Sequence, residues 1–221
     1  MFNPSELGTK EYWDKFYETE INNFNTIGDV GEIWFGEAKE KQALKFCKEI
    51  LNENNSSIMD IGCGNGHLSL VLIQNLEIHP LSIYAFDYSE KALELSRSLF
   101  ESENVIDSIN LDVLDICNDV STKWIDLAYV AIDKGTYDAI SLSPENAVDK
   151  LEKYRHNLYK MTKSNGYLLI FSCNWTEDEL KCQFIKEENS QWIYYKTLPS
   201  ITFSFGGKVG KNVSSIVFRK K

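Results

Sequence analysis

The sequence predicts a single α/β domain built on a mostly parallel sheet that ends in an antiparallel hairpin. Apolar runs of strand length alternate with segments in which apolar residues recur at helical spacing, and this alternation is typical of βαβ units. The last part of the chain breaks the pattern, because two strand-like runs there flank the pair Gly206-Gly207. With 221 residues, 43% of them hydrophobic and 25% charged, and with no repeat or linker, one globular domain over residues 1–221 is expected.

The parallel part of the predicted sheet contains five strands, at residues 56–61, 81–87, 105–115, 124–133 and 166–174. The last of these, "GYLLIFSCN", is a continuous apolar run, as expected of a buried central strand. Two antiparallel strands are predicted at residues 191–205 and 212–221. Five β/α steps before a terminal hairpin are the layout of the class I methyltransferase fold, a Rossmann-like sheet of seven strands. A dinucleotide-binding sheet more often ends with another parallel unit.

Helices are predicted to connect the strands at residues 67–76, 89–103 and 144–163. Ser89 is a plausible N-cap of the second helix, and the third begins near Pro144 and is expected to stop at Asn165-Gly166.

Residues 1–53 are predicted to form an N-terminal helical cover and a lid, in front of a catalytic sheet core at residues 54–221. Residues 10–24 have the pattern of an amphipathic helix, which could simply cover the sheet. The loop that follows, "NTIGDVGEIWFGE", carries Trp34 and Phe35 beside two glycines. We favour a lid for this loop, because the glycines give hinge freedom and the rings can anchor the closed position.

The turn after the first strand reads Asp60-Ile61-Gly62-Cys63-Gly64-Asn65-Gly66. A nicotinamide fingerprint is spaced G-x-G-x-x-G, and its third glycine allows close packing of helix on strand. Here the third glycine comes one residue early and His67 takes the last fingerprint position, which disfavours a dinucleotide. Glycines at this spacing after an acid suit S-adenosyl-L-methionine, whose methionine part the backbone can approach closely. The alternative is a strained turn without a ligand. The cofactor-binding candidates of this turn are Asp60, Gly62, Cys63, Gly64 and Asn65.

Two more acids stand at the ends of predicted strands. Asp87 closes the second strand, where a carboxylate can accept hydrogen bonds from both ribose hydroxyls, and Tyr88 follows it. Asp112 ends the third strand, where it can bind the adenine amino group while the amide of Val113 or Leu114 meets a ring nitrogen. Together with Asp60 they mark the sheet edge at which open α/β sheets bind ligands. The cofactor predicted from this edge is S-adenosyl-L-methionine.

The chemical class of the methyl acceptor is predicted from the segment at the end of the fourth strand, "AIDKGTYDAISL". This segment lacks the Asn-Pro-Pro-Tyr sequence typical of enzymes that methylate planar nitrogens. Asp133 could bind an incoming lysine ammonium, orient the amine and relay its proton; the alternative is a turn or N-cap residue before Gly135. Ring faces attract alkylammonium groups, although any single ring is more often core packing. The candidates for the substrate channel are Trp13, Trp34, Phe35, Thr136 and Trp175.

Composition limits the partners and the compartment. A formal net charge of −10 argues against nucleic-acid binding and suits either solubility or a basic protein partner. The five cysteines form no Cys-x-x-Cys pair, so neither a disulfide framework nor a metal site is expected. No signal core or membrane-length apolar run is present, so the expected location is the cytoplasm, or the cytoplasm and the nucleus, with no membrane partner.

Five segments, in this order, resemble a eukaryotic family of protein-lysine methyltransferases that act on translation elongation factor 1-alpha: "LGTKEYW", "GDVGEIWFGE", "DKGTYDAISL", "SCNWT" and "FSFGGK". The resemblance runs from Leu7 to the C-terminus. It implies lysine methylation with S-adenosyl-L-methionine, donor binding at Gly62, Gly64, Asp87 and Asp112, and an acceptor edge at Asp133. A small-molecule methyltransferase, another protein substrate and a non-catalytic binding module are the competing readings.

Overall fold

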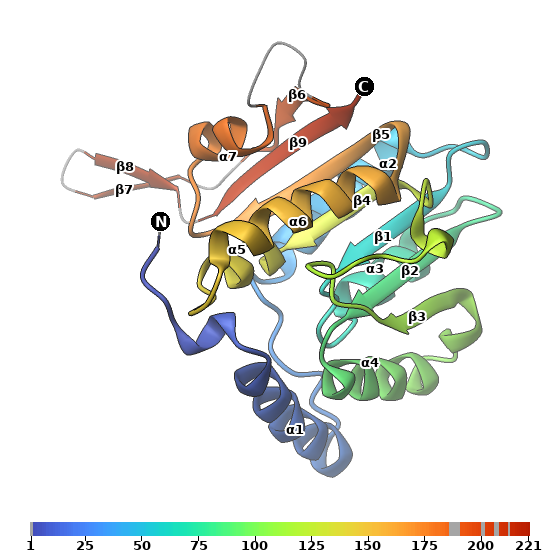
Figure 1. Cartoon of the computed structure of the whole chain (residues 1–221). Helices are drawn as coiled ribbons and strands as arrows, with labels where there is room; N and C mark the ends of the chain where they lie inside the picture. The colour runs from blue at the N-terminus through green and yellow to red at the C-terminus, as the bar shows by residue number, and fades with distance from the viewer. Residues whose placement is uncertain (1, 186–190, 200–201, 206–207, 212) are drawn as a thin grey trace.

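The computed structural model of the chain describes residues 2–185, 191–199, 202–205, 208–211 and 213–221. Its main sheet has seven strands in the order β3-β2-β1-β4-β5-β9-β6, in which β9 runs antiparallel between β5 and β6 (Figure 1). The predicted mostly parallel sheet with antiparallel C-terminal strands is therefore confirmed. The strands are β1 (Ser57–Ile61), β2 (Ser82–Asp87), β3 (Ile109–Val113), β4 (Ala128–Lys134), β5 (Thr162–Ser172), β6 (Trp192–Thr197) and β9 (Ser214–Lys220).

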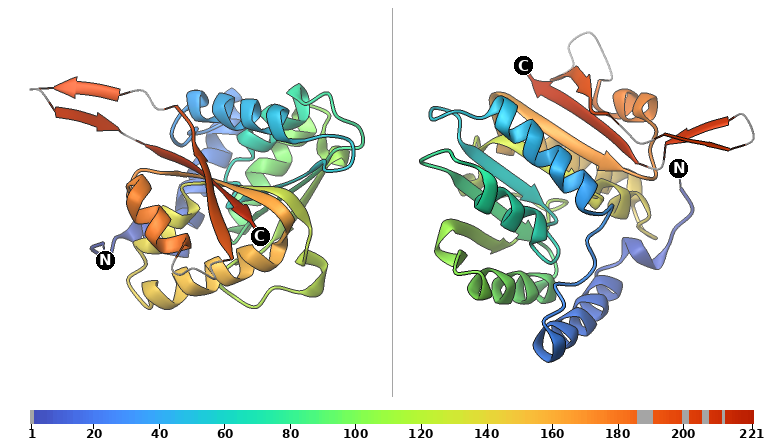
Figure 2. Two further views of the ribbon diagram at one scale, coloured as in Figure 1. Left: turned by 90° about the horizontal axis from the view of Figure 1, so that it is seen from above. Right: turned by 180° about the vertical axis from the view of Figure 1, so that it is seen from behind.

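Helices cover both faces of the sheet (Figure 2). The α-helices are α1 (Lys10–Ile27), α2 (Glu37–Ile50), α3 (His67–Asn75), α4 (Glu90–Ser102), α5 (Thr136–Ser141), α6 (Ala147–Met161) and α7 (Glu177–Phe184). Short 3-10 turns are η1 (Glu6–Gly8), η2 (Ile106–Ser108) and η3 (Thr122–Trp124).

The two faces of the sheet are filled by alternate residues of each strand. In β1, Ile58 packs into the core beneath α2, α3 and α4, whereas Met59 and Ile61 pack into the core beneath α6 and α7. In β4, Val130 likewise faces the first core and Ala131 the second. This two-residue period decides where polar residues inside the same strands point.

Chain order reverses between β1 and β4, which lie side by side in parallel register. In open α/β sheets the ligand-binding crevice forms outside the carboxyl ends of the strands at such a reversal. The glycine turn follows β1 and the Asp133–Thr136 turn follows β4, so both predicted halves of the site meet there.

Several predicted boundaries shift. Ser89 caps α4 as predicted, because its side chain accepts the Ala92 backbone N–H. Helix α6 ends at Met161 rather than at Asn165-Gly166, which instead lies inside β5, where the register with β4 is irregular. Asn165 takes a left-handed φ of 63° there. The signal read as a helix stop is thus an irregularity within a strand.

The predicted strand at residues 191–205 is wrong as a single element. Only β6 joins the main sheet; β7 (Thr202–Phe205) pairs instead with β8 (Lys208–Lys211) in a separate two-stranded ribbon that projects from the body (Figure 2). Pro199, which cannot donate to a sheet ladder, lies between β6 and β7. The predicted turn at Gly206-Gly207 and the predicted strand start at residue 212 lie outside the described residues.

The predicted N-terminal helix is present as α1, and it lies against α4 rather than over the sheet (Figure 1). Tyr17 of α1 forms a small buried cluster there with Ala92 and Leu95. Helix α2 is the N-terminal element that covers the sheet, through buried Phe46 and Cys47. In the described part of the chain, no helix has the length and apolar character to cross a membrane.

Candidate functional site

A cavity opens at the carboxyl ends of β1, β2 and β4, and segments from the N-terminal region close its other side. Eleven of the predicted site residues line it: Trp13, Trp34, Phe35, Gly62, Cys63, Gly64, Asn65, Asp87, Tyr88, Leu114 and Thr136. Sequence reasoning missed several other lining residues, among them Leu7, Gly8, Tyr17, Asp115, Lys134 and Asp138.

The glycine turn forms a cradle that side chains would fill. Gly62 and Gly64 have left-handed φ values of 62° and 57°. A Cβ on Gly62 would collide with the Thr136 hydroxyl, and one on Gly64 would lie 2.5 Å from the Tyr17 hydroxyl oxygen. Both positions therefore require glycine, for their backbone conformation and for close packing against Thr136 and Tyr17, and both line the cavity.

Asp87 joins the cradle to the second strand. Its Oδ2 accepts the Gly64 N–H at 3.1 Å and its Oδ1 accepts the Ser89 N–H at 2.9 Å. Burial raises the pKa of Asp87 to about 6, against the opposing effect of these backbone donors. A buried, cavity-lining carboxylate with free acceptor capacity suits a pair of ligand hydroxyls.

Asp60 lies behind the cradle. The period of β1 turns its side chain toward α3, where its Oδ2 accepts the Ser69 hydroxyl at 2.7 Å, and it does not line the cavity. Burial raises the pKa of Asp60 to about 6. From this position it can act on a ligand amino group only indirectly, through the turn or through water.

The third strand presents a different acid from the predicted one. Asp112 lies within β3, pairs with the exposed Lys123 and does not line the cavity; nor does Val113, which is 51% exposed. The Leu114 amide is already used, since it donates to the Asp87 carbonyl at 3.0 Å. Asp115, beyond the strand end, lines the cavity instead, and its Oδ1 accepts the Cys117 N–H at 2.8 Å. Asp112 is too early in the chain to reach past the strand.

Asp133 is completely buried and does not line the cavity. Its Oδ1 accepts the N–H groups of Gly135 and Thr136, at 3.1 and 3.0 Å. Its Oδ2 accepts the Tyr137 N–H at 3.0 Å and the Tyr154 hydroxyl at 2.5 Å. Four donors fill the roughly four acceptor positions of a carboxylate, and burial raises its pKa to about 7. This geometry argues against direct contact between Asp133 and an incoming amine, and it fits the alternative of a turn anchor.

Asp138 is the acid that lines the cavity on the β4 and β5 side. Its Oδ2 accepts the Cys173 N–H at 2.7 Å, and its Oδ1 accepts the Ser172 hydroxyl at 2.5 Å, which leaves Oδ1 room for another donor. Burial raises the pKa of Asp138. It escaped sequence reasoning because the short helix α5 that carries it was not predicted, although it sits only five residues after Asp133.

Aromatic rings form one wall of the cavity. Trp13 and Trp34 meet edge to face, with ring centroids 5.3 Å apart, and Phe35 lies beside Gly135. The Trp13 indole is fixed by donating to the Leu7 carbonyl at 2.8 Å. Trp175 does not line the cavity; its ring packs against Tyr137 and Phe2 instead.

A family model described as a methyltransferase domain matches residues 52–213. A mouse protein named EEF1A lysine methyltransferase 2 is 42% identical over 221 residues, which cover all of this chain and 86% of the mouse protein. A Schizosaccharomyces pombe protein named protein-lysine N-methyltransferase efm4 is 36% identical, over 97% of this chain and 94% of that protein. The chain belongs to this methyltransferase family.

The crystal structure of a TehB-like SAM-dependent methyltransferase from Corynebacterium glutamicum shares the fold with this family member. The TM-score is 0.59 at 17% identity, and the match covers 94% of this chain and 98% of that one. The predicted class I methyltransferase fold is confirmed.

S-adenosyl-L-methionine is the cofactor of the family, and the cavity fits it. Gly62 and Gly64 line the cavity without side chains of their own, Asp87 offers acceptors for hydroxyl groups, and Asp115 lies next along the same edge. Among the described residues, no group of three or more His, Cys, Asp or Glu side chains could hold a metal ion.

Proposed function

We propose that the chain is an S-adenosyl-L-methionine-dependent protein-lysine N-methyltransferase that methylates translation elongation factor 1-alpha. The observation that carries the proposal is the similarity of the whole chain, at 42% identity, to the mouse protein named for that activity. The cavity supports it, because carboxylates and aromatic rings line it together. A net charge of −10 suits docking on a basic protein.

The cofactor, when bound, supplies an electrophilic methyl group on a sulfonium. On the donor side the Gly62–Asn65 backbone and Asp87 hold it, with Tyr88, Leu114 and Asp115 completing the pocket. Asp60 ties β1 to α3 behind the glycine turn, by accepting the Ser69 hydroxyl.

The acceptor lysine must lose a proton before it can react. With a reference pKa of about 10.4, forming the neutral amine at pH 7 costs roughly 4.6 kcal/mol. A desolvated, aromatic surrounding lowers that cost, and here Trp34 and Phe35 supply it. Asp138 is the carboxylate that can accept a hydrogen bond from the ammonium and orient it, through its remaining Oδ1 position.

Asp133 has a supporting role in this proposal. By binding three successive backbone amides it fixes the turn on which Gly135 and Thr136 line the cavity. The Thr136 hydroxyl in turn donates to the Ile61 carbonyl at 2.7 Å, which ties the acceptor edge to the glycine turn.

The proposed location is the cytoplasm; a shared cytoplasmic and nuclear location is the alternative, and fluorescence imaging of the tagged protein distinguishes the two. All five cysteines are free thiols in the structure, and Cys173 and Cys182 are exposed, which suits a reducing compartment.

The test is transfer of labelled methyl groups from S-adenosyl-L-methionine to purified elongation factor 1-alpha from cells that lack this enzyme. Wild-type protein should label one lysine, mapped by mass spectrometry. Asp138→Asn should bind the cofactor but transfer label at least tenfold more slowly; the Asn amide can donate to the Ser172 hydroxyl, so the local structure is kept. Asp112→Asn, outside the cavity, is the matched control and should retain transfer.

Other outcomes select other readings. Label confined to small metabolites in a hypomethylated extract would favour a small-molecule methyltransferase. A labelled lysine in a different protein would change the substrate, and cofactor binding without any transfer would favour a binding module.

A further inference from the structure

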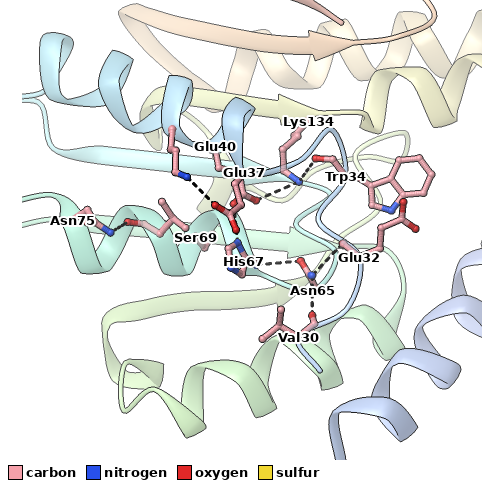
Figure 3. A network of polar contacts seen from close by, with 12 residues as sticks. Val30, Glu32, Trp34, Glu37, Glu40, Asn65, His67, Ser69, Asn75 and Lys134 are labelled. Atoms are coloured by element: carbon pink, nitrogen blue, oxygen red, sulfur yellow. Dashed lines mark hydrogen bonds and ion pairs between the residues drawn. The ribbon is translucent and has the colours of Figure 1, made fainter. Parts of the chain in front are cut away.

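Lys134, the last residue of β4, does not point its ammonium group at the acceptor side of the cavity. Its Nζ donates to the backbone carbonyl of Trp34 at 3.1 Å and lies 3.5 Å from Oε1 of Glu40 (Figure 3). The side chain is only 14% exposed. The Trp34 carbonyl belongs to the loop between α1 and α2. The charged hydrogen bond from Lys134 therefore ties the backbone of this loop to the end of β4.

Glu40 is the centre of this contact. It lies on α2 with its side chain 1% exposed, and its Oε2 is 2.7 Å from Nδ1 of His67, the first residue of α3 after the glycine turn. Lys134 Nζ lies 3.5 Å from Oε1, an oxygen that accepts no hydrogen bond from the described residues. A buried carboxylate needs such partners, so Glu40 fixes the positions of Lys134 and His67 relative to each other.

The loop held in this way runs from Gly28 to Gly36, between α1 and α2, and contains no helix or strand. Gly28, Gly31 and Gly36 all have left-handed φ values. Apart from Lys134, its main tie to the sheet is Asn65 of the glycine turn, whose Nδ2 donates to the Val30 carbonyl at 3.0 Å and the Glu32 carbonyl at 3.3 Å (Figure 3). The end of this loop carries Trp34 and Phe35, two of the rings that line the cavity.

We infer that Lys134 is a positioning residue that latches the 28–36 loop over the cavity, with Glu40 as the buried carboxylate that holds the latch. The latch places Trp34 and Phe35 against the site, while Asn65 couples the same loop to the turn that binds the cofactor. The inference rests on the proposed function for what the cavity binds. The latch is formed by residues of this chain alone, so it can be tested without substrate.

The test is amide hydrogen exchange of the unliganded full chain, followed by mass spectrometry of peptides that cover residues 28–36. Exchange reports local opening, so losing a charged hydrogen bond that closes the loop should speed it about tenfold or more. We expect this for Lys134→Met, with unchanged exchange in β1 and β5 and a several-fold weaker affinity for S-adenosyl-L-methionine. Lys134→Arg, which keeps the cation, should restore most of the protection.

Lys39→Met is the matched control. Lys39 lies on the same helix as Glu40, is 8% exposed and donates to the Ser215 hydroxyl at 2.9 Å, away from the cavity. It should leave the exchange of residues 28–36 unchanged. Equal loop exchange in Lys134→Met and wild type, or faster exchange spread evenly over the chain, would overturn the latch. Failure of the proposed function would look different, as wild-type protein that protects the loop normally but does not label elongation factor 1-alpha.

Discussion

The hydrogen bond from Tyr154 to Asp133 gives a prediction that separates a structural from a chemical role for this acid. Tyr154 is completely buried, and its hydroxyl donates to Asp133 Oδ2 at 2.5 Å. Tyr154→Phe removes only this donor and keeps the ring. The Tyr137 N–H stays on the same oxygen, so the turn should persist in weakened form.

The magnitude depends on the charge of Asp133. A hydrogen bond to an ionised group contributes about 1.5–3 kcal/mol, and one between neutral groups about 0.5–1.5 kcal/mol. Burial raises the pKa of Asp133 to about 7, so the acceptor is ionised at pH 8.5 and neutral at pH 5.5. Tyr154 favours the ionised form, and its removal raises that pKa further. Tyr154→Phe should therefore cost roughly 1–2 kcal/mol more at pH 8.5 than at pH 5.5.

Urea unfolding of wild type and variant at the two pH values measures this difference. Tyr137→Phe is the control: that ring is also completely buried, but its hydroxyl partners Arg155 rather than Asp133. Its cost should be the same at both pH values. The reasoning fails if Tyr154→Phe also costs the same at both, because Asp133 would then not change charge in this range.

The raised pKa of Asp133 also fixes how its contribution to the stability of the wild-type protein changes with pH. The folded pKa of Asp133 lies above the ordinary value of 3.8, so the folded state holds a proton that the unfolded state has released. The contribution of Asp133 to the free energy of unfolding is thus largest below about pH 4 and falls as pH rises toward 7.

Three further predictions concern the cavity. Asp87→Asn should weaken S-adenosyl-L-methionine binding about tenfold at pH 8 in calorimetry, and the gap from wild type should close below pH 6 as wild-type Asp87 itself becomes protonated. Asp115→Ala should weaken binding several-fold while Asp112→Ala changes it less than twofold, because only Asp115 lines the cavity; the reverse order would restore the sequence-based assignment. Trp34→Ala should lower cofactor affinity or turnover more than thermal stability, and a purely thermal effect with normal kinetics would refute the lid.

The parallel part of the fold could be predicted because its signals are local. Apolar runs mark β1, β2 and β5, and Ser89 marks the start of α4 by its capping side chain. The failures depend on contacts that local patterns do not contain. Asn165-Gly166 favours a turn in isolation, yet the β4 pairs of Thr162 and Tyr167 on either side of it keep it within β5. The split between β6 and β7 likewise depends on a long-range contact, because β6 pairs with β9 only as far as Thr197.

In the site, too, local sequence signals could be predicted, whereas positions that depend on the folded structure could not. The glycine turn was predictable because left-handed conformation and close approach demand glycine at particular spacings. Asp138 could not be found in this way. It lines the cavity because it lies on α5, a helix of six residues that is too short to show a helical hydrophobic period in the sequence.

Strand period explains which acids reach the cavity. Side chains inside a strand point to one face or the other, and in a sheet covered on both sides each face is filled by a helix. Asp60 is therefore directed toward α3, where it accepts the Ser69 hydroxyl, and Asp133 toward α6, where it also binds the amides of the turn after β4. Among the acids of the sheet strands and of the segments that follow them, those at or beyond a strand end, as Asp87, Asp115 and Asp138 are, line the cavity; Glu32 reaches it from the 28–36 loop. A carboxylate near a strand end must therefore be assigned by its parity and its distance past the last ladder residue, since the residue type alone makes Asp112 and Asp115 equivalent.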